Sequence, residues 1–159
     1  MIQRIQSIYL FVAVALLAAS GFVGNVFNII SRSNNTLYGY DAIAKYTLDS
    51  KQLISTEPQY LWVYPVALAI FGIYALISFK NLKKQLKLSR LFWGFIILTL
   101  LVQLGLKYYV QFSMDKADFI QASMGAQFYL TVIAMPFSHL AFMGVLKDKR
   151  TIDSVDRIR

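Results

Sequence analysis

Four long apolar stretches constrain this chain more than any other feature. A hydrocarbon core about 30 Å thick is crossed by a helix of about 20 mostly apolar residues, and a spanning backbone must satisfy its own hydrogen bonds in lipid. Together the stretches take up more than half of the 159 residues, which leaves no room for a separate soluble domain. The predicted transmembrane helices run from about Ile5 to Ile30, Pro58 to Phe79, Leu91 to Phe112 and Gly125 to Leu146.

The first stretch also has the parts of a secretory signal peptide. Arg4 precedes an apolar run from Ile8 to Leu17, and the small residues Ala18, Ala19 and Ser20 follow it. The apolar run of a signal peptide ends after about 7–15 residues, whereas this one continues to Ile30. The length therefore favours a retained helix over a cleaved leader.

The charges indicate how the helices thread the membrane. The chain is 15% charged and 57% hydrophobic with a net charge of +8, whereas soluble domains average about 25% charged residues. With both termini on one side, that side holds most of the Lys and Arg residues, and the positive-inside rule makes it the cytoplasm. Topology thus accounts for the basic character, and we expect no nucleic acid as a partner. These residues are Arg4, Lys80, Lys83, Lys84, Lys87, Arg90, Lys147, Lys149, Arg150, Arg157 and Arg159.

Part of this basic side is predicted to contact lipid headgroups or a cytoplasmic partner, because Lys and Arg near a membrane surface attract anionic lipids. We further predict an ion pair between Asp156 and Arg4 that would close the bundle. The predicted contact residues are Arg4, Lys80, Lys83, Lys84, Lys87, Arg90, Asp156, Arg157 and Arg159.

The connections between the stretches predict the architecture. An inner loop at 80–90 is short, so neighbouring helices should run antiparallel in an up-down bundle. The outer loops are 31–57 and 113–124, and a cytoplasmic tail covers 147–159. Within 31–57, apolar and polar residues alternate from Tyr40 to Leu48, which is typical of a half-buried strand. The loop could therefore form a short β-hairpin, and the alternative is an irregular loop. The expected fold class is an all-α integral membrane protein, a single domain of four transmembrane helices.

Small residues at helical spacing mark a predicted packing face, because they let helices approach closely in lipid. This face combines pairs in the first stretch with a three-residue repeat in the second. Packing within the bundle is the first interpretation, and a face for another subunit is the second. The residues are Ala15, Ala19, Ser20, Gly24, Ala69, Gly72 and Ala75.

Polar residues at membrane depth are candidates for function. Gln103 and His139 are the deepest, Ser138 lies beside His139, and Pro136 should bend the fourth helix. These three polar residues form the predicted intramembrane polar site of a small transporter or channel. The alternative is that His139 is satisfied by the carbonyl that Pro136 frees.

The sequence contains little catalytic chemistry. There is no cysteine and one histidine, and no acidic residue lies within the four stretches. A metal site built from His or Cys ligands and a Ser-His-Asp arrangement are therefore not expected. We predict no enzyme activity, no catalytic residue, no metal and no cofactor.

The two ends of the chain carry a family resemblance. The opening Met1-Ile2-Gln3-Arg4-Ile5-Gln6-Ser7-Ile8-Tyr9-Leu10 and the ending Asp153-Ser154-Val155-Asp156-Arg157-Ile158-Arg159 resemble those of a bacterial four-helix membrane family, the domain of unknown function four-two-nine-three. The resemblance implies a bacterial inner-membrane protein with an uncut N-terminus. It supplies no activity, cofactor or catalytic residue.

These features lead to two functional hypotheses. The first is a non-enzymatic accessory or scaffold subunit of a larger inner-membrane complex, with membrane lipids and a membrane protein or a second copy as partners. The second is a small transporter or channel that uses Gln103 and His139. Both place the chain in the bacterial cytoplasmic membrane with both termini in the cytoplasm.

Overall fold

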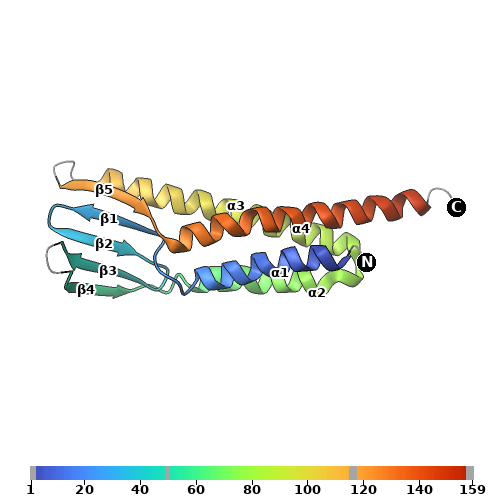
Figure 1. The fold of residues 1–159 in the computed structure, drawn as a ribbon, viewed down its shortest axis with the longest axis horizontal. Coiled ribbons are helices and arrows are strands. Elements are labelled where there is room, and N and C mark those ends of the chain that lie inside the picture. The colour runs from blue at the N-terminus through green and yellow to red at the C-terminus, as the bar shows by residue number, and fades with distance from the viewer. Residues whose placement is uncertain (1–2, 49–50, 115–117, 157–159) are drawn as a thin grey trace.

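The computed structural model describes residues 3–48, 51–114 and 118–156. The chain forms a rod with four long helices along it and an antiparallel sheet at one end, and α1 begins and α4 ends away from that sheet (Figure 1). The helical elements are α1 (Gln3–Ser20), α2 (Val63–Ile77), the 3-10 turn η1 (Ser78–Lys80), α3 (Leu82–Ser113) and α4 (Ala126–Asp156). The strands are β1 (Phe27–Ser31), β2 (Asn34–Tyr38), β3 (Ala42–Thr47), β4 (Leu53–Pro58) and β5 (Phe119–Met124).

Three helical segments of the described chain are long and apolar enough to cross a membrane: Val63–Lys80, Leu82–Ser113 and Ala126–Ser154. The apolar part of α1, Ile5–Ser20, is shorter. At 1.5 Å per residue, the 32 residues of α3 span about 48 Å, which exceeds the thickness of a hydrocarbon core. Part of α3 therefore extends past the ends of α1 and α2, where it runs beside the sheet (Figure 1).

The five-stranded sheet corrects the all-α prediction. The first helix ends at Ser20 rather than at Ile30, because Gly21 and Gly24 interrupt it and Gly24 has a φ of 77° that L-residues rarely adopt. The apolar residues that follow form β1 instead. The prediction failed because length and apolarity alone do not distinguish a helix from a buried strand.

The sheet is formed by strands from both segments that were predicted as outer loops, 31–57 and 113–124, together with β1. Its strand order is β4-β3-β2-β1-β5, and every neighbouring pair is antiparallel. The region of the predicted hairpin forms β3 and β4, but three more strands extend it. β5 comes from the connection between α3 and α4 and pairs with β1, with Phe27 opposite Met124. A lone hairpin is marginal in water, so this pairing between distant segments is what makes the sheet viable.

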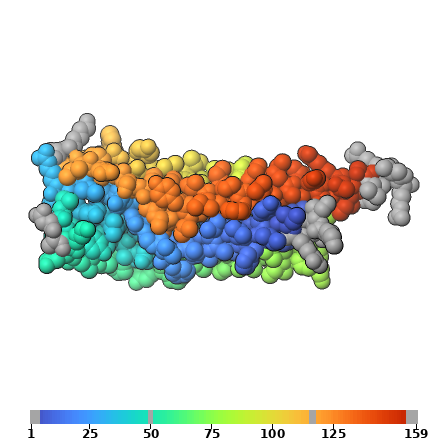
Figure 2. All heavy atoms as spheres, viewed as in Figure 1, coloured from blue at the N-terminus to red at the C-terminus, as the bar shows by residue number. Residues whose placement is uncertain are grey.

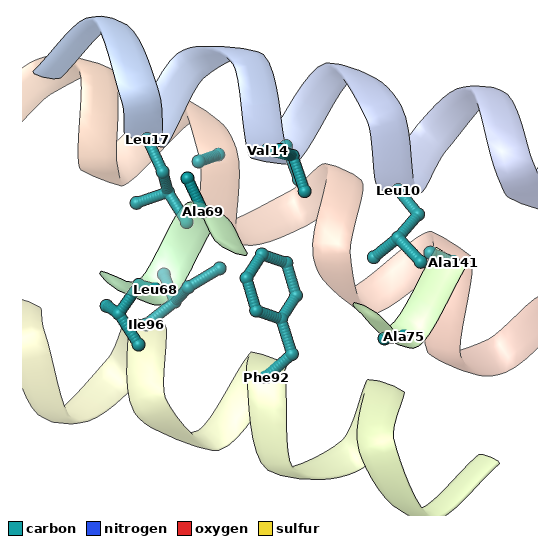
Figure 3. Close-up of a cluster of buried hydrophobic side chains, with 11 residues drawn as sticks. Leu10, Val14, Leu17, Leu68, Ala69, Ala75, Phe92, Ile96 and Ala141 are labelled. Carbon is teal, nitrogen blue, oxygen red and sulfur yellow. The ribbon is translucent and has the colours of Figure 1, made fainter. Parts of the chain in front are cut away.

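Phe92 lies at the centre of the helical core. It is fully buried, and its ring points from α3 toward Val14 of α1 (Figure 3). Leucines and alanines of α1, α2 and α4 surround it, and α1 and α4 lie side by side along the rod (Figure 2). The labelled neighbours are Leu10, Val14, Leu17, Leu68, Ala69, Ala75, Ile96 and Ala141.

A second apolar cluster holds the sheet against the helices. Phe27 and Ile29 of β1 are buried together with Tyr40, and Val110 of α3 and Met114, directly after α3, pack on them. The last turns of α3 thus cover one face of the sheet near β1 and β5. The rest of that face, over β2 and β3, remains open to a cavity described below.

Candidate functional site

A cavity of about 590 Å³ lies between the sheet and α3. Phe27, Tyr38 and Ile43 line its sheet side, and they share one face because they stand opposite one another in the strand register. Its other wall is α3 from Leu98 to Val110. A volume of this size is typical of a ligand pocket, for which the range is about 300–1,000 Å³. We call this cavity the junction pocket.

Gln103 and Tyr40 are two of the polar residues in the mostly apolar lining of this pocket. Gln103 is 2% exposed, and its Nε2 donates a hydrogen bond to the Tyr40 hydroxyl. Its Oε1 is buried without a hydrogen-bond partner within the described chain. Buried polar atoms are seldom left unpaired, so Gln103 is an unusual residue of this interior.

Two hydrogen bonds hold the backbone of Tyr40 in place. Its backbone N–H donates to Oε1 of Gln127 at the start of α4, 3.1 Å away, and its carbonyl accepts from the N–H of Trp62 at 3.1 Å. Burial raises the pKa of the Tyr40 phenol, and the hydrogen bond from Gln103 lowers it in part. The phenol is therefore neutral at physiological pH and can both donate and accept.

A second polar pair lies at the bundle side of the pocket. The hydroxyls of Tyr64 and Thr99 are 2.7 Å apart, and Thr99 also donates to the carbonyl of Phe95 at 2.7 Å. Since Thr99 has one proton, Tyr64 must be the donor between them. These two groups satisfy each other, whereas Gln103 retains a free acceptor.

The structure does not bring Gln103 and His139 together. The His139 ring packs on Trp93 with 5.1 Å between centroids, and Gln103 lies ten residues, about 15 Å, farther along α3 than Trp93. Ser138 is buried and donates to the carbonyl of Met135 at 2.7 Å. Nδ1 of His139 has no hydrogen-bond partner within the described chain, so the carbonyl near Pro136 does not satisfy that nitrogen. The predicted polar site is thus divided between two places.

The small residues of α2 and α1 lie in different surroundings. Ala69, Gly72 and Ala75 are buried, and an added Cβ at Gly72 would collide with Val14 and Phe92. In α1, Ser20 is buried, Ala19 is half-buried and Ala15 is exposed. Gly24 lies beyond the helix in the turn before β1 and is exposed. The apolar residues that α1 buries are Leu10, Ala13, Val14 and Leu17.

Basic residues gather around η1 and the start of α3, at the end of the rod opposite the sheet, which we call the basic end. Lys80, Lys83, Lys84, Lys87 and Arg90 are all exposed there. The side chains of Arg4, Asp156, Arg157 and Arg159 lie outside the described residues, as does the predicted pair of Asp156 with Arg4.

Another contact joins α1 to α4 at the basic end. Gln6 is buried and its Nε2 donates to Oδ2 of Asp148 at 2.7 Å. Gly144 makes room for it, because a Cβ there would collide with the Gln6 side chain. The helices thus approach closely at this point.

Sequence reasoning singled out Gln103 but missed its surroundings. Tyr40 enters the sequence prediction only as part of an alternating segment, and its contacts with Gln103 and Gln127 have no counterpart in any sequence pattern. The contact between Tyr40 and Gln103 joins residues 63 positions apart, so no local pattern could show it. Among the described residues, no group of three His, Cys, Asp or Glu side chains could hold a metal ion.

The long apolar helices with an antiparallel sheet at one end place the chain in the class of small membrane proteins with an α+β fold. The family described as Domain of unknown function (DUF4293) matches residues 2–158, so the chain belongs to it. This confirms the resemblance seen at the two ends of the sequence. No curated protein matches the chain.

Proposed function

We propose that this protein is a non-enzymatic accessory or scaffold subunit of a larger complex in the bacterial inner membrane, and that its partner adds a strand to the open edge of β4. The observation that carries this proposal is that edge. Among the described residues, β4 pairs only with β3 and forms one border of the sheet. An edge strand presents a row of unpaired backbone groups that can template pairing with another chain.

The backbone geometry identifies which groups are free. The N–H of Gln59 donates to the carbonyl of Asp41 at 2.7 Å, directly after the register that pairs Ala42 with Pro58. Antiparallel partners alternate between hydrogen-bonded and non-bonded pairs. Ser55 and Glu57 therefore turn their backbone groups toward β3, and Thr56 turns its groups toward the open edge.

The side chains of β4 leave this edge accessible. Leu53 and Ile54 are exposed apolar residues at the end of the strand far from the helices. Charges and prolines commonly protect sheet edges, but here Glu57 and Pro58 stand only at the end near the helices, where Glu57 lies 3.9 Å from Lys45. The outer part of β4 thus has the character of a docking edge.

The orientation belongs to the same proposal. The exposed lysines of the basic end lie at the opposite end of the rod from the sheet, and the positive-inside rule assigns that end to the cytoplasm. The termini would then be cytoplasmic, and the sheet would project from the outer face of the membrane. The docking partner is accordingly an outer segment of another membrane protein or of a second copy.

The test is purification of the tagged full-length chain in mild detergent followed by mass spectrometry of its companions. We expect at least one stoichiometric membrane partner, which Thr56→Pro releases because proline removes the outward N–H. Thr56→Val is the matched control, since it keeps that N–H and suits a strand. A chain that purifies as a monomer without companions, or a partner that both variants retain, would contradict the proposal.

No observation supports the transporter hypothesis in the same way. It required Gln103 and His139 to act at one site, and about 15 Å of helix separates their surroundings.

A further inference from the structure

We propose that two copies of this chain pair in parallel through the part of α3 that runs beside the sheet. The pairing surface, which we call the α3 seam, consists of Leu98, Leu101, Gly105, Tyr108 and Phe112. This inference rests on the proposed placement of the sheet outside the membrane. It does not depend on any partner at β4.

The seam has the spacing of a helix face that packs on another helix. Its five residues follow one another at alternating intervals of three and four, as the contact positions of a coiled coil do. All five are exposed. The helix buries its other side in its own bundle, through Phe92, Ile96, Thr99 and Gln103. At 3.6 residues per turn, the seam therefore faces away from the rest of the chain.

Most of the seam lies beyond the level at which α2 begins. Tyr64, in the first turn of α2, contacts Thr99, and Phe112 lies 13 residues, about 20 Å, farther along α3. Trp62 and Tyr64 are exposed at this level, and Trp and Tyr are enriched at the lipid–water interface. Lipid would therefore not cover the outer part of the seam. Exposed apolar patches in water mark interaction sites.

The shape of this surface fits a second copy of itself. A groove of about 590 Å³ lies beside the seam, where Tyr108, Tyr109 and Phe112 of α3 meet Phe119 of β5. Phe112 is 88% exposed and stands at the margin of this groove. In a two-fold interface the same patch serves both copies, and each contact occurs twice. Phe112 of each copy would enter the groove of the other.

Gly105 supports a close approach of two helices. Two copies in one membrane have the same orientation, so their α3 helices run parallel and equal positions meet. Gly105 would then face Gly105 of the second copy, and glycine lets another backbone come near. Within its own chain, nothing lies within 4 Å of a Cβ at Gly105. Because glycine weakens a helix interior and has no packing role in its own chain, a second α3 accounts for it.

The exposed area is sufficient for a stable pair. Tyr108, Tyr109 and Phe112 are 62%, 71% and 88% exposed. A covered aromatic side chain buries about 150–250 Å², so these three offer on the order of 400 Å² in each copy. That is half of the roughly 800 Å² per partner of a standard interface. Leu98 and Leu101, which are also exposed, add to this area.

Charge does not oppose the pairing of two identical chains. The net charge is +8, so two copies repel wherever their basic residues face each other. Between residues 98 and 112 the sequence has one charged residue, Lys107, which is not a seam position. Its Nζ lies 5.7 Å from the ring centroid of Tyr108 in the same chain. A partner recruited by opposite charge would find little to bind here, whereas a second copy meets a neutral surface.

The test is disulfide cross-linking of the full-length chain in membranes, since the chain has no cysteine of its own. A disulfide forms only where two Cα atoms come within about 7 Å. Under a mild oxidant, Leu101→Cys should give at least ten times more covalent dimer than Leu106→Cys, which changes an exposed leucine of α3 off the seam. Equal cross-linking of the two, or none at Leu101→Cys, would overturn the proposal.

The same assay separates this interface from the edge of β4. Adding Thr56→Pro to Leu101→Cys should leave the covalent dimer unchanged, even where that substitution releases a partner from β4. Loss of the covalent dimer would show that the copies meet through β4, and it would overturn pairing through the seam.

Two arginine variants test the seam without cross-linking. Gly105→Arg should weaken the association of two copies at least tenfold, because it sets like charges against each other across the seam. Ser113→Arg is the control, since it adds the same charge at an exposed position off the seam. Native mass spectrometry of the chain in nanodiscs measures the fraction of dimer, and equal fractions for the two variants would contradict the proposal. Pairing depends on concentration, so unfolding measured at one chain per micelle reports on the separate copy.

Discussion

The two ends of the rod are built on different principles. The helical bundle is filled by apolar and small side chains around Phe92, whereas the junction with the sheet contains a cavity and the buried amides of Gln103 and Gln127. Each of these amides keeps one atom unpaired within the described chain. Tight packing contributes stability, and unpaired buried groups beside a cavity favour a ligand site. We therefore infer that the bundle anchors the protein and that the sheet end carries its function.

The largest expected effect is at the centre of the bundle. Phe92→Ala should lower the free energy of unfolding by on the order of 3 kcal/mol, because it leaves a cavity among four helices. Denaturant unfolding in detergent micelles measures this value. Phe112→Ala is the matched control on the same helix, since Phe112 is 88% exposed. Equal losses for the two variants would show that the bundle centre is not the source of stability.

The next effect tests the close approach of α1, α2 and α3. Gly72→Val should lower the free energy of unfolding by about 1–3 kcal/mol through overpacking, because the added atoms would meet Val14 and Phe92. Gly94→Val should cost little, since nothing lies within 4 Å of a Cβ there. Thermal melts of both variants make the comparison, and a less stable Gly94→Val would contradict it.

At the sheet end, Gln127→Leu should cost about 1–3 kcal/mol, because it leaves the Tyr40 N–H buried without its acceptor. The loss should appear first as faster hydrogen exchange in β2 and β3, while the centre of α3 stays protected. Uniform loss of protection along the chain would mean that the junction and the bundle unfold as one unit.

The smallest effect concerns alkaline pH. Burial raises the pKa of Tyr40 above its ordinary value of 10.0, and burial with the charge of Glu57 does the same for Tyr38. The unfolded chain then loses these protons first, so their contribution to stability is full below pH 10 and declines as the pH rises further. Tyr40→Phe should make the decline shallower in a pH series of melts. Tyr60→Phe, at an exposed residue, is the control and should not.

The sequence supported some parts of this fold better than others. Apolar length was enough for α2, α3 and α4, and alternation indicated β3. The sheet as a whole could not be predicted, because β5 reaches β1 across about 90 residues and strand pairing between distant segments leaves no local pattern. The predicted first helix was wrong beyond Ser20, because Gly21 and Gly24 end the helix there although the sequence stays apolar.

The candidate site could likewise be predicted only in part. Gln103 was predicted as a deep polar residue from its place in an apolar stretch, but its neighbours Tyr40 and Tyr64 come from the sheet connection and from α2. His139 was paired with Gln103 because both lie well inside apolar stretches. The structure separates them, since depth along an axis does not determine which helix faces meet.

The orientation of the rod is the central claim, and cysteine labelling tests it most directly because the chain has no cysteine of its own. Lys51→Cys places a thiol beside β4 at the sheet end, and Lys147→Cys places one on α4 toward the basic end; both positions are exposed. A membrane-impermeant maleimide should label the first in intact spheroplasts and the second only after permeabilisation. Labelling of Lys147→Cys but not Lys51→Cys in intact spheroplasts would contradict the account.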